Sequence, residues 1–273
     1  MRYKYVFCLL VYRNSEDLID SLNSIKEKVS DYKVIVVNSY YDDESKAIFE
    51  NIAKEHGCDF INTENKGYGY GNNRGMEYAL KNYEFDYLVV SNPDIIIEKF
   101  NESEFLLNNK DCVVAPLITT LNGKAQNPYW IKRAPKTEKL LYLGQKKKSN
   151  FLYYLGVALN KVRRVCGLKR FLKSNKDTLE IFASHGSFLI FPKSVFEKLG
   201  LIYDENMFLF SEEAYLAHLF ENAGIKTVLT KDIEILHKED GSMKLSKIDE
   251  DGEGRKSIIY YYEKMVVNKQ EKE

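Results

Sequence analysis

Three residues, Asn92, Pro93 and Asp94, directly follow the apolar run at residues 87–91. If this run is a strand of an open α/β sheet, Asp94 lies beyond its carboxyl end, where such sheets bind ligands. Pro93 has no backbone N–H and therefore ends the strand. A carboxylate beside an amide suits Mg²⁺, which proteins hold through one or two carboxylates together with substrate phosphates. The same three residues are also common in plain turns.

Four glycines lie upstream of this strand, in the sequence NKGYGYGNNRG at residues 65–75. Glycine lets a backbone turn tightly and approach a ligand. Asn72 and Asn73 are suitable caps for the helix that we expect to follow. The spacing does not match the dinucleotide-binding pattern G-x-G-x-x-G, and no lysine stands where a P-loop requires one. Taken alone, the segment predicts a loop whose purpose its spacing does not define.

Two adjacent acids, Glu212 and Glu213, follow a short apolar segment that contains Phe208 and Phe210. Ser211 is a suitable N-cap, so we expect a helix that begins with these acids and ends at Gly224. Acids in a first turn have an ordinary explanation, because they complement the helix dipole. Alternatively, one of the carboxylates acts as a general base at the crevice.

The elements that position these residues alternate through the first half of the chain. Periodicity and turn residues predict a helix between each pair of successive strands. The strands are expected at residues 5–12, 33–37, 58–61 and 87–91, and the helices begin near Ser15, after Asp42 and after the glycine-rich segment. This order predicts a parallel sheet with helices on both faces.

The second half is expected to add two strands, at residues 112–118 and 186–191, and a helix at 193–199. Residues 240–257 combine charges with glycines and precede a final helix at 257–267. Such a segment could be a mobile lid that orders over a ligand, or a plain linker.

Length and composition restrict the class of protein. With 273 residues and 44% hydrophobic content, the chain can form one large α/β domain, and collagen-like, disordered and disulfide-scaffold classes are excluded. The four cysteines form no C-x-x-C pair, which predicts reduced core residues of a cytosolic protein. The apolar run at residues 5–12 is too short to span a bilayer, and no signal pattern precedes it. We therefore expect a cytoplasmic location.

The net charge is zero, but residues 132–176 contain fourteen Lys or Arg and a single acid, Glu138. Aromatic residues and leucines are interleaved with these charges. Such a mixture is typical of a helix on an anionic membrane surface, here the inner face of the plasma membrane. Binding of single-stranded nucleic acid and a merely solvated helical insert are the alternatives. We predict the membrane contact, expect no nucleic acid, and leave the solvated insert open.

Taken together and in order, these motifs resemble glycosyltransferase family 2, in its rhamnosyltransferase-like branch. The matching positions are Asn65-x-Gly67-Tyr68-Gly69-x-Gly71-Asn72-Asn73-x-Gly75, Asn92-Pro93-Asp94, Gly186-Ser-Phe-Leu-Ile, Tyr203-Asp204-Glu205-x-x-Phe208-Leu209-Phe210-x-Glu212-Glu213, Ala223-Gly224 and His237. The resemblance covers nearly the whole chain apart from the basic insert. It implies a GT-A fold, which is an α/β fold with a mixed, mostly parallel central sheet and helices on both faces.

The resemblance implies an inverting transfer of a sugar from a nucleoside diphosphate to a hydroxyl. Asp94 would contact Mg²⁺ or Mn²⁺ and the donor diphosphate, and His237 would be a second metal ligand. Glu213 stands where the family has its catalytic base, which is usually Asp. The other implied donor-binding positions are Tyr12, Asn38, Asp43, Asn65, Gly67, Gly71, Asn72, Asn73, Asn92 and Arg255, and the implied acceptor-binding positions are Gly186, Ser187 and Glu212.

The resemblance also suggests how the chain is divided and what it binds. Within one GT-A domain, residues 1–125 would bind the donor, 126–180 form the basic aromatic insert, 181–240 bind the acceptor, and 241–273 form a lid and final helix. The donor would be a nucleoside-diphosphate sugar, with deoxythymidine diphosphate rhamnose favoured by the resemblance alone. The acceptor would be a glycan or a lipid-linked saccharide of cell-surface polysaccharide synthesis.

Two positions differ from the family's pattern. Asn38-Ser39 stands where Asp-Asn is usual, and Tyr215 follows Glu213 where a further acid is expected nearby. An inactive module that binds a nucleotide sugar or a glycan is therefore the alternative function. A nucleotidyltransferase is disfavoured, because it needs a glycine-rich loop directly after the first strand, and residues 11–15 at that place contain no glycine.

Overall fold

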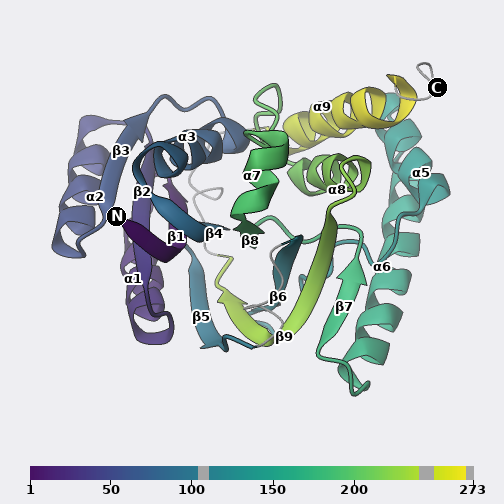
Figure 1. The fold of residues 1–273 in the computed structure, drawn as a ribbon. Helices are drawn as coiled ribbons and strands as arrows, with labels where there is room; N and C mark the ends of the chain where they lie inside the picture. The colour runs from purple at the N-terminus through teal and green to yellow at the C-terminus, as the bar shows by residue number, and fades with distance from the viewer. Residues whose placement is uncertain (104–110, 240–248, 269–273) are drawn as a thin grey trace.

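A computed structural model describes residues 1–103, 111–239 and 249–268 (Figure 1). Within these residues a nine-stranded sheet has the order β3-β2-β1-β4-β8-β6-β9-β5, with β7 also paired to β9. The strands are β1 (Arg2–Val11), β2 (Tyr32–Ser39), β3 (Asp59–Thr63), β4 (Glu84–Ser91), β5 (Ile95–Phe100), β6 (Cys112–Thr120), β7 (Thr178–Ile181), β8 (Phe188–Pro192) and β9 (Lys226–His237). The helices are α1 (Glu16–Lys28), α2 (Asp43–Glu55), α3 (Tyr68–Asn82), α5 (Pro135–Lys146), α6 (Asn150–Leu172), α7 (Lys193–Leu199), α8 (Glu212–Asn222), α9 (Glu250–Tyr262) and the π-helical turn η2 (Glu263–Val267).

Strand directions bring most carboxyl ends to one edge of the sheet. β1 is parallel to β2 and β4, and β2 is parallel to β3. β8 is antiparallel to both β4 and β6, so β6 runs in the same direction as β4, and β9 is parallel to β6. The segments after β1, β2, β3, β4, β6 and β9 therefore leave the sheet at the same edge, which we call the carboxyl edge.

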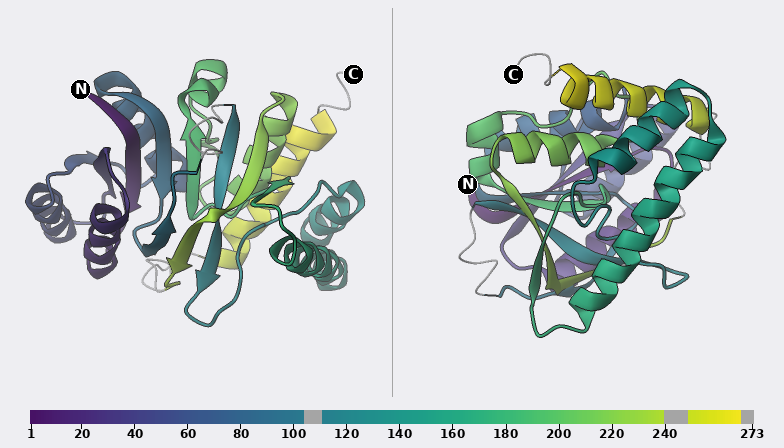
Figure 2. Two further views of the ribbon diagram at one scale, coloured as in Figure 1. Left: turned by 60° about the horizontal axis from the view of Figure 1, so that its bottom comes forward. Right: turned by 90° about the vertical axis from the view of Figure 1, so that its right-hand side faces the viewer.

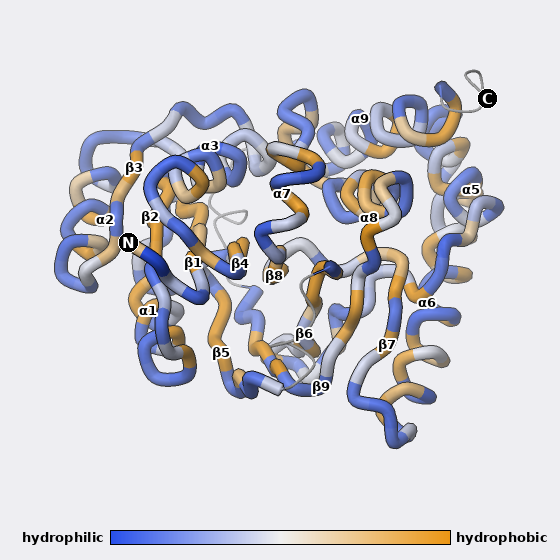
Figure 3. Tube along the Cα trace, viewed as in Figure 1, coloured by the Kyte–Doolittle hydropathy of each residue, from blue (hydrophilic) through white to orange (hydrophobic). Residues whose placement is uncertain are grey.

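The two faces of the sheet carry separate apolar cores. Along β1, Val6 and Cys8 pack with residues of α3, α7 and α8, whereas Phe7 and Leu9 pack with residues of α1 and α2. Figure 2 shows helices on both sides of the sheet, and Figure 3 shows the apolar strands between them. A strand covered on both faces is apolar throughout, which explains the uninterrupted hydrophobic run in β1. The predicted α/β architecture is confirmed.

The glycine-rich segment is helical, which corrects the prediction of a loop. α3 begins at Tyr68, with Gly67 as its N-cap residue at φ +107°. Asn72 and Asn73 lie in the second turn and are therefore not caps. The backbone N–H of Tyr68 donates instead to the carbonyl oxygen of Phe208 (2.8 Å), which fixes the start of the helix against the second half of the chain.

Two of the glycines let α3 lie directly on the sheet. A Cβ at Gly71 would lie 2.4 Å from Leu10 Cδ1, and one at Gly75 would lie 2.9 Å from Val37 Cγ2. These contacts are too short for a side chain, so the glycines serve helix–sheet packing. The donor contact implied for Gly67 and Gly71 stays a prediction.

The second half of the sheet was only partly anticipated. Strands β5, β7 and β9 were not expected from the sequence, and they supply antiparallel pairs β5–β9 and β7–β9. Ser211 does not cap α8 with its side chain, because its backbone is left-handed at φ +68°. The expectation that all four cysteines are core residues is wrong for Cys166, which is exposed.

The final helix begins earlier than predicted. α9 starts at Glu250 rather than at 257, because the Asp249 side chain accepts a hydrogen bond from the backbone N–H of Gly252 (3.0 Å). Of the proposed lid at residues 240–257, residues 240–248 lie outside the described part of the chain. The remainder, including Arg255, belongs to this helix.

The basic insert contains an antiparallel helix pair at one end of the molecule (Figure 2). α5 and α6 approach closely, since a Cβ at Gly144 would lie 2.5 Å from the Tyr153 backbone nitrogen. Glu138, the single acid of residues 132–176, is buried and lies 2.5 Å from His218 Nε2. Among the helices that the structure describes, none has both the length and the apolar character needed to cross a bilayer.

We expect Gly67→Ala to lower the free energy of unfolding by about 2–4 kcal/mol, because the new Cβ adds both backbone strain and a clash. That Cβ would lie 2.3 Å from the carbonyl oxygen of Phe208. Urea denaturation of the purified variant measures the loss. Gly123→Ala is the matched control, because Gly123 also has a positive φ (+69°) but no atom within 4 Å of its Cβ position. Its expected loss is about 1 kcal/mol. Equal losses in the two variants would contradict the packing argument.

Candidate functional site

Asp94 lies at the carboxyl edge, between the end of β4 and the start of β5. The residue is only 4% exposed, and its carbonyl oxygen accepts a hydrogen bond from the backbone N–H of Lys238 (3.0 Å). The Oδ2 atom lies 3.2 Å from Nε2 of His237, the last residue of β9. The Oδ1 atom is buried and has no hydrogen-bond partner within the described residues. Asp94 and His237, which are 143 positions apart in the sequence, thus lie together, and we call this place the Asp94–His237 corner.

The tautomer of His237 follows from its neighbours. The Gln126 amide nitrogen donates to Glu239 Oε1 (2.7 Å), which turns the amide oxygen of Gln126 toward His237. His237 Nδ1 lies 2.7 Å from that oxygen and must therefore carry a proton. In the neutral ring, Nε2 then has a lone pair, and this lone pair faces the carboxylate of Asp94. The lone pairs of His237 Nε2 and Asp94 Oδ2 repel each other at 3.2 Å, so this arrangement requires either a cation between the two atoms or a proton on Nε2.

The corner fits a divalent metal ion. An imidazole nitrogen whose other N–H is held by a carbonyl oxygen is the usual arrangement of a metal-binding histidine. The unpartnered Asp94 Oδ1 offers a further oxygen ligand. The described residues contain no group of three or more His, Cys, Asp or Glu side chains able to hold a metal. A substrate diphosphate would have to supply the remaining ligands, as is common for Mg²⁺ sites.

A second histidine, His185, lies beside this corner. The ring centres of His185 and His237 are 5.6 Å apart. The backbone N–H of Ser187 donates to His185 Nδ1 (3.2 Å), and the Ser187 hydroxyl lies 2.9 Å from the same atom. Burial, followed by the nearby His237, lowers the pKa of His185 to about 3. His185 is therefore a neutral ring with its proton on Nε2.

The two acids of α8 lie beside the loop that precedes β8. The backbone N–H of Gly186 lies 3.4 Å from Glu213 Oε1. Glu212 is buried, and its Oε1 atom has no hydrogen-bond partner in the described part of the chain. Burial, and then the charge of Glu213, raises the pKa of Glu212 to about 8. Burial also raises the pKa of Glu213, which lies partly accessible at the start of the helix.

A strained turn presents these acids. Phe210 and Ser211 are consecutive residues in the left-handed region, with φ of +71° and +68°. A non-glycine residue there costs about 1 kcal/mol or more and persists only where its surroundings impose it. The Ser257 hydroxyl of α9 donates to the carbonyl oxygen of Leu209 (2.7 Å), and Gly254 packs against the Phe210 ring. α9 therefore holds the turn.

Tyr68 connects the Asp94–His237 corner to the acid pair. Its hydroxyl lies within hydrogen-bond distance of Asn92 Oδ1 (3.2 Å) and of the Gly186 carbonyl oxygen (3.0 Å). The backbone N–H of Asn92 donates to the Ser187 carbonyl oxygen (2.8 Å). Asn92, Gly186 and Ser187, which the sequence placed in the site, are thus brought together. Their contacts to donor and acceptor stay predictions.

A second group lies at the carboxyl ends of β1 and β2. Asn38 is buried, and its amide nitrogen donates to Asn62 Oδ1 (2.7 Å). Its own Oδ1 has no hydrogen-bond partner within the described residues. Tyr12 packs edge-on against Tyr41, and the Arg13 guanidinium lies 4.0 Å from the centre of the Tyr41 ring. The unpartnered Oδ1 of Asn38 is a buried hydrogen-bond acceptor, and the two aromatic rings lie in the segments that follow β1 and β2.

Asn72 and Asn73, which both lie in α3, make different hydrogen bonds. Asn73 donates to the Tyr203 carbonyl oxygen (2.9 Å) and to Glu205 (3.0 Å), and accepts from the Tyr203 backbone N–H (3.2 Å). These bonds hold α3 to the turn before α8. Asn72 donates to the Tyr68 carbonyl oxygen (3.0 Å), but its Oδ1 is buried without a partner in the described residues. Asn72 is therefore the better placed of the two for a ligand.

Three further predicted donor residues lie apart from these groups. Asn65 is exposed, and Asp43, in the first turn of α2, accepts from the Tyr40 hydroxyl (3.2 Å). The Arg255 Nε atom donates to Gln145 of α5 (3.3 Å), so its guanidinium faces the helical layer. The structure does not bring these side chains to Asp94, and their donor contacts stay predictions.

Residues 7–200, which are well over half of the chain, match the family model described as Glycosyl transferase family 2. The chain belongs to glycosyl transferase family 2. The matched region includes Asp94 and Gly186 but ends before Glu213 and His237, so the placement of these two residues rests on the structure.

Two individual proteins are similar over most of the chain. The low-salt glycan biosynthesis hexosyltransferase Agl10 of Haloferax volcanii is 22% identical over 236 residues, covering 85% of this chain and 66% of that protein. The crystal structure of GalNAc-T7 with UDP, GalNAc and Mn²⁺ has a TM-score of 0.60 and 12% identity, covering 86% of this chain and 44% of that one. The fold of this family member is of the GT-A type, as the sequence predicted. The chain spans less than two thirds of either protein's length.

The sequence analysis missed several residues of the site. Gln126 and Glu239 orient His237, His185 lies beside it, and Asn62 orients Asn38. None of these stands in a motif. Their roles depend on which strand ends are neighbours, and the unexpected strand β9 decided that for the first three. Only Tyr68, which lies inside the glycine-rich motif, carried a usable sequence signal.

We expect Glu212→Gln to stabilise the protein at pH 8 but not at pH 5. The folded Glu212 keeps its proton up to about pH 8, whereas the carboxyl ionises near its ordinary pKa of 4.5 when unfolded. Stability is therefore lost as pH rises through this window, and glutamine, which cannot ionise, removes the loss. The expected gain at pH 8 is about 1–3 kcal/mol. Urea midpoints at both pH values measure it, with the exposed Glu197→Gln as control. An equal gain at both pH values would contradict this explanation.

Proposed function

We propose that this chain transfers a hexose or deoxyhexose from a nucleoside-diphosphate donor to a hydroxyl of a glycan or lipid-linked saccharide, with inversion at the anomeric carbon. The proposal rests on the presence of two groups of functional side chains at the carboxyl edge of the sheet. The Asp94–His237 corner suits a diphosphate and its metal, and the Glu212–Glu213 pair suits proton removal. Tyr68 hydrogen-bonds to residues at both places.

Glu213 is the base in this proposal. Its raised pKa makes the carboxylate a stronger proton acceptor than an exposed glutamate. The acceptor hydroxyl loses its proton to Glu213 as its oxygen attacks the anomeric carbon, and the bond from that carbon to the diphosphate oxygen breaks. Glu212, with a pKa of about 8, stays protonated near neutral pH and so adds no second negative charge beside the base.

Asp94 and His237 would hold Mg²⁺ or Mn²⁺ together with the donor diphosphate. The bound ion would offset the negative charge that develops on the leaving diphosphate. GalNAc-T7 was crystallised with UDP and Mn²⁺, which supports a metal of this kind in the shared fold. The role of the protein is to orient the ligands, and Gln126 does so for His237.

The donor end would be read by Asn38. Its unpartnered carbonyl oxygen can accept from the ring N–H of a pyrimidine base, and Tyr12 and Tyr41 lie in the segments that follow β1 and β2 at the same edge. Uracil and thymine both carry such a donor, so this contact fits either UDP or deoxythymidine diphosphate sugars. Rhamnose rests on the family resemblance alone, whereas the name of Agl10 supports a hexose and glycan synthesis.

An inactive binding module on the same fold is the second candidate. Asn38 carries no charge where the family pattern has an acid, and Tyr215 stands in a region where a further acid is usual. Such a module would keep the donor site but would have no need of a base.

We expect Asp94→Ala to abolish metal-dependent binding of a nucleoside diphosphate. The variant loses the carboxylate whose Oδ1 and Oδ2 face the corner, while the cavity it leaves is small. Calorimetry with UDP and deoxythymidine diphosphate, each with and without Mn²⁺, measures the effect, and a bound ligand also raises the melting temperature. Asp86→Ala, at an exposed ion pair with Arg2, is the control. Retained metal-dependent binding in Asp94→Ala would disprove the assignment of the corner.

We expect Glu213→Gln to bind the donor within about twofold of the wild type but to turn over about 10²–10⁴ times more slowly, because general base catalysis contributes rate enhancements of this size. Donor binding is measured by calorimetry and turnover by release of the nucleoside diphosphate. Glu197→Gln should change neither quantity. If turnover is the same in Glu213→Gln and the wild type, Glu213 is not the base. If the wild type binds donor but transfers no sugar to any acceptor, the inactive module is favoured.

A further inference from the structure

The outer side of α6 is apolar although it faces solvent. Phe151, Tyr154 and Val162 are 76%, 64% and 62% exposed, and Leu155 and Val165 are also exposed. Their spacing over residues 151–165 places all five on one side of the helix, opposite the buried Gly156 and Phe171. We call these five residues the α6 stripe. In Figure 2, right, α6 crosses the face turned toward the viewer, and no other described element covers it.

The surroundings of the α6 stripe are strongly basic. Lys147 and Lys148 precede α6, and Lys161, Lys169 and Lys173 lie along or just beyond it. Glu138, the single acid of residues 132–176, is buried against His218 and contributes no negative charge to this surface.

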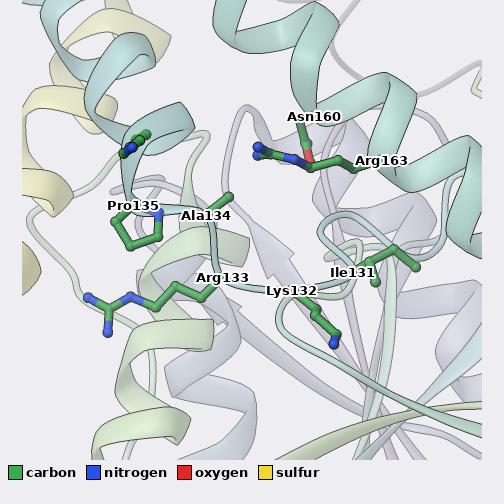
Figure 4. A pocket seen from close by; sticks show the side chains of 8 residues that line it. Ile131, Lys132, Arg133, Ala134, Pro135, Asn160 and Arg163 are labelled. Carbon is green, nitrogen blue, oxygen red and sulfur yellow. The ribbon is translucent and has the colours of Figure 1, made fainter.

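A cavity of about 580 Å³ beside α6 adds four more cationic residues to the same end of the molecule (Figure 4). These are Lys132, Arg133, Lys136 and Arg163. None of the residues that line this cavity belongs to the Asp94 corner or to the acid pair. Arg133 is paired with Glu221 Oε2 (2.9 Å), so the cavity adds the positive charges of Lys132, Lys136 and Arg163, and we assign it no ligand of its own.

We propose that the α6 stripe is a membrane-docking surface, which inserts at the level of the headgroups of an anionic lipid bilayer. An amphipathic helix with exposed aromatic and aliphatic residues on one side and Lys or Arg beside them lies in the plane of such an interface. The cations stay in contact with lipid phosphates, and each adds to the attraction toward an anionic leaflet.

Two other occupants fit the α6 stripe less well. A second copy of the chain, related by a twofold axis, would bring the same basic residues face to face. Single-stranded nucleic acid binds to basic surfaces through aromatic rings that stack on bases. Only Phe151 and Tyr154 of the stripe are aromatic, and Leu155, Val162 and Val165 cannot stack in this way.

The opposite side of α6 faces the candidate site, which gives the docking a purpose. The Asn160 amide nitrogen donates to the Tyr129 carbonyl oxygen (3.2 Å). The charge of Arg164 is close enough to contribute to the low pKa of His185. A helix that contacts lipid on one side and the crevice on the other would keep the site near a lipid-linked acceptor. The docking itself does not depend on the proposed donor chemistry.

The test is flotation of the full chain with vesicles of 70% phosphatidylcholine and 30% phosphatidylglycerol at low and high salt. The wild type should float with these vesicles, less with pure phosphatidylcholine, and less at 0.5 M than at 0.1 M salt, because salt screens the attraction. Phe151→Ser/Val162→Ser should lower the partition coefficient about 10-fold or more, through the loss of inserted apolar surface. Lys161→Gln/Lys169→Gln should lower it about 5-fold for each cation removed.

Ile48→Ser/Leu201→Ser is the matched control, because both side chains are exposed apolar residues outside the insert, at 43% and 38%. This variant should float like the wild type. Since all four substituted apolar side chains lie on the surface, melting curves should show intact folds. An environment-sensitive dye on the exposed Cys166, at the edge of the stripe, should shift to shorter wavelength with anionic vesicles, in a background with the half-buried Cys58 replaced by Ser.

Several results would overturn the proposal. These are a wild type that does not float, a Phe151→Ser/Val162→Ser variant that floats as well as the wild type, or a wild-type dimer that only this variant dissociates. Binding of oligo(dT) that is lost in the same variant, without vesicle binding, would assign the surface to nucleic acid. Calorimetry of nucleoside diphosphates on the same samples separates the two proposals, since the α6 variants should keep any donor binding of the wild type.

Discussion

The close approach of Gly67 to the backbone of Phe208 is the contact on which the site depends. α3 connects β3 to β4 within the parallel half of the sheet, and the turn at Phe208 leads into α8 and its acids. At this contact the Tyr68 backbone N–H donates to the Phe208 carbonyl oxygen (2.8 Å), in a space that leaves no room for a Cβ at residue 67. The bonds of Asn73 to Tyr203 and Glu205 reinforce the same junction. Because of it, the Asp94–His237 corner and the Glu212–Glu213 pair have a fixed separation.

The fold was predictable wherever local chemistry agreed with tertiary contacts. The parallel half, with Asp94 at the carboxyl end of β4, followed from apolar runs, caps and turn residues, since each strand there is covered on both faces. The glycine-rich segment was mistaken for a loop because glycine usually interrupts helices. Here tertiary packing outweighs that propensity, since Gly71 and Gly75 let α3 lie against Leu10 and Val37.

Only those site residues that stand in sequence motifs were predictable. Asp94, Asn92 and Glu213 stand in recognisable patterns, whereas Gln126, His185 and Asn62 become neighbours of the site through strand order alone. β9 was the decisive omission, since its last residue is His237 and its pairing with β6 and β5 brings that ring to Asp94. The polar atoms left open at Asp94, Glu212, Asn38 and Asn72 are costly for folding, and sequence gives no measure of that cost.

The strained turn at Phe210 and Ser211 links two distant parts of the chain thermodynamically. Its left-handed backbone persists because Ser257 and Gly254 of α9 hold Leu209 and Phe210 in place. If α9 detached, the turn would relax to ordinary dihedral angles and the first turn of α8 would lose its fixed start. We therefore expect the amides of α9 and those at the beginning of α8 to belong to one cooperative unit of local opening, with coupled hydrogen exchange. Glu213, the base in the proposed function, is thus only as rigid as the anchoring of α9.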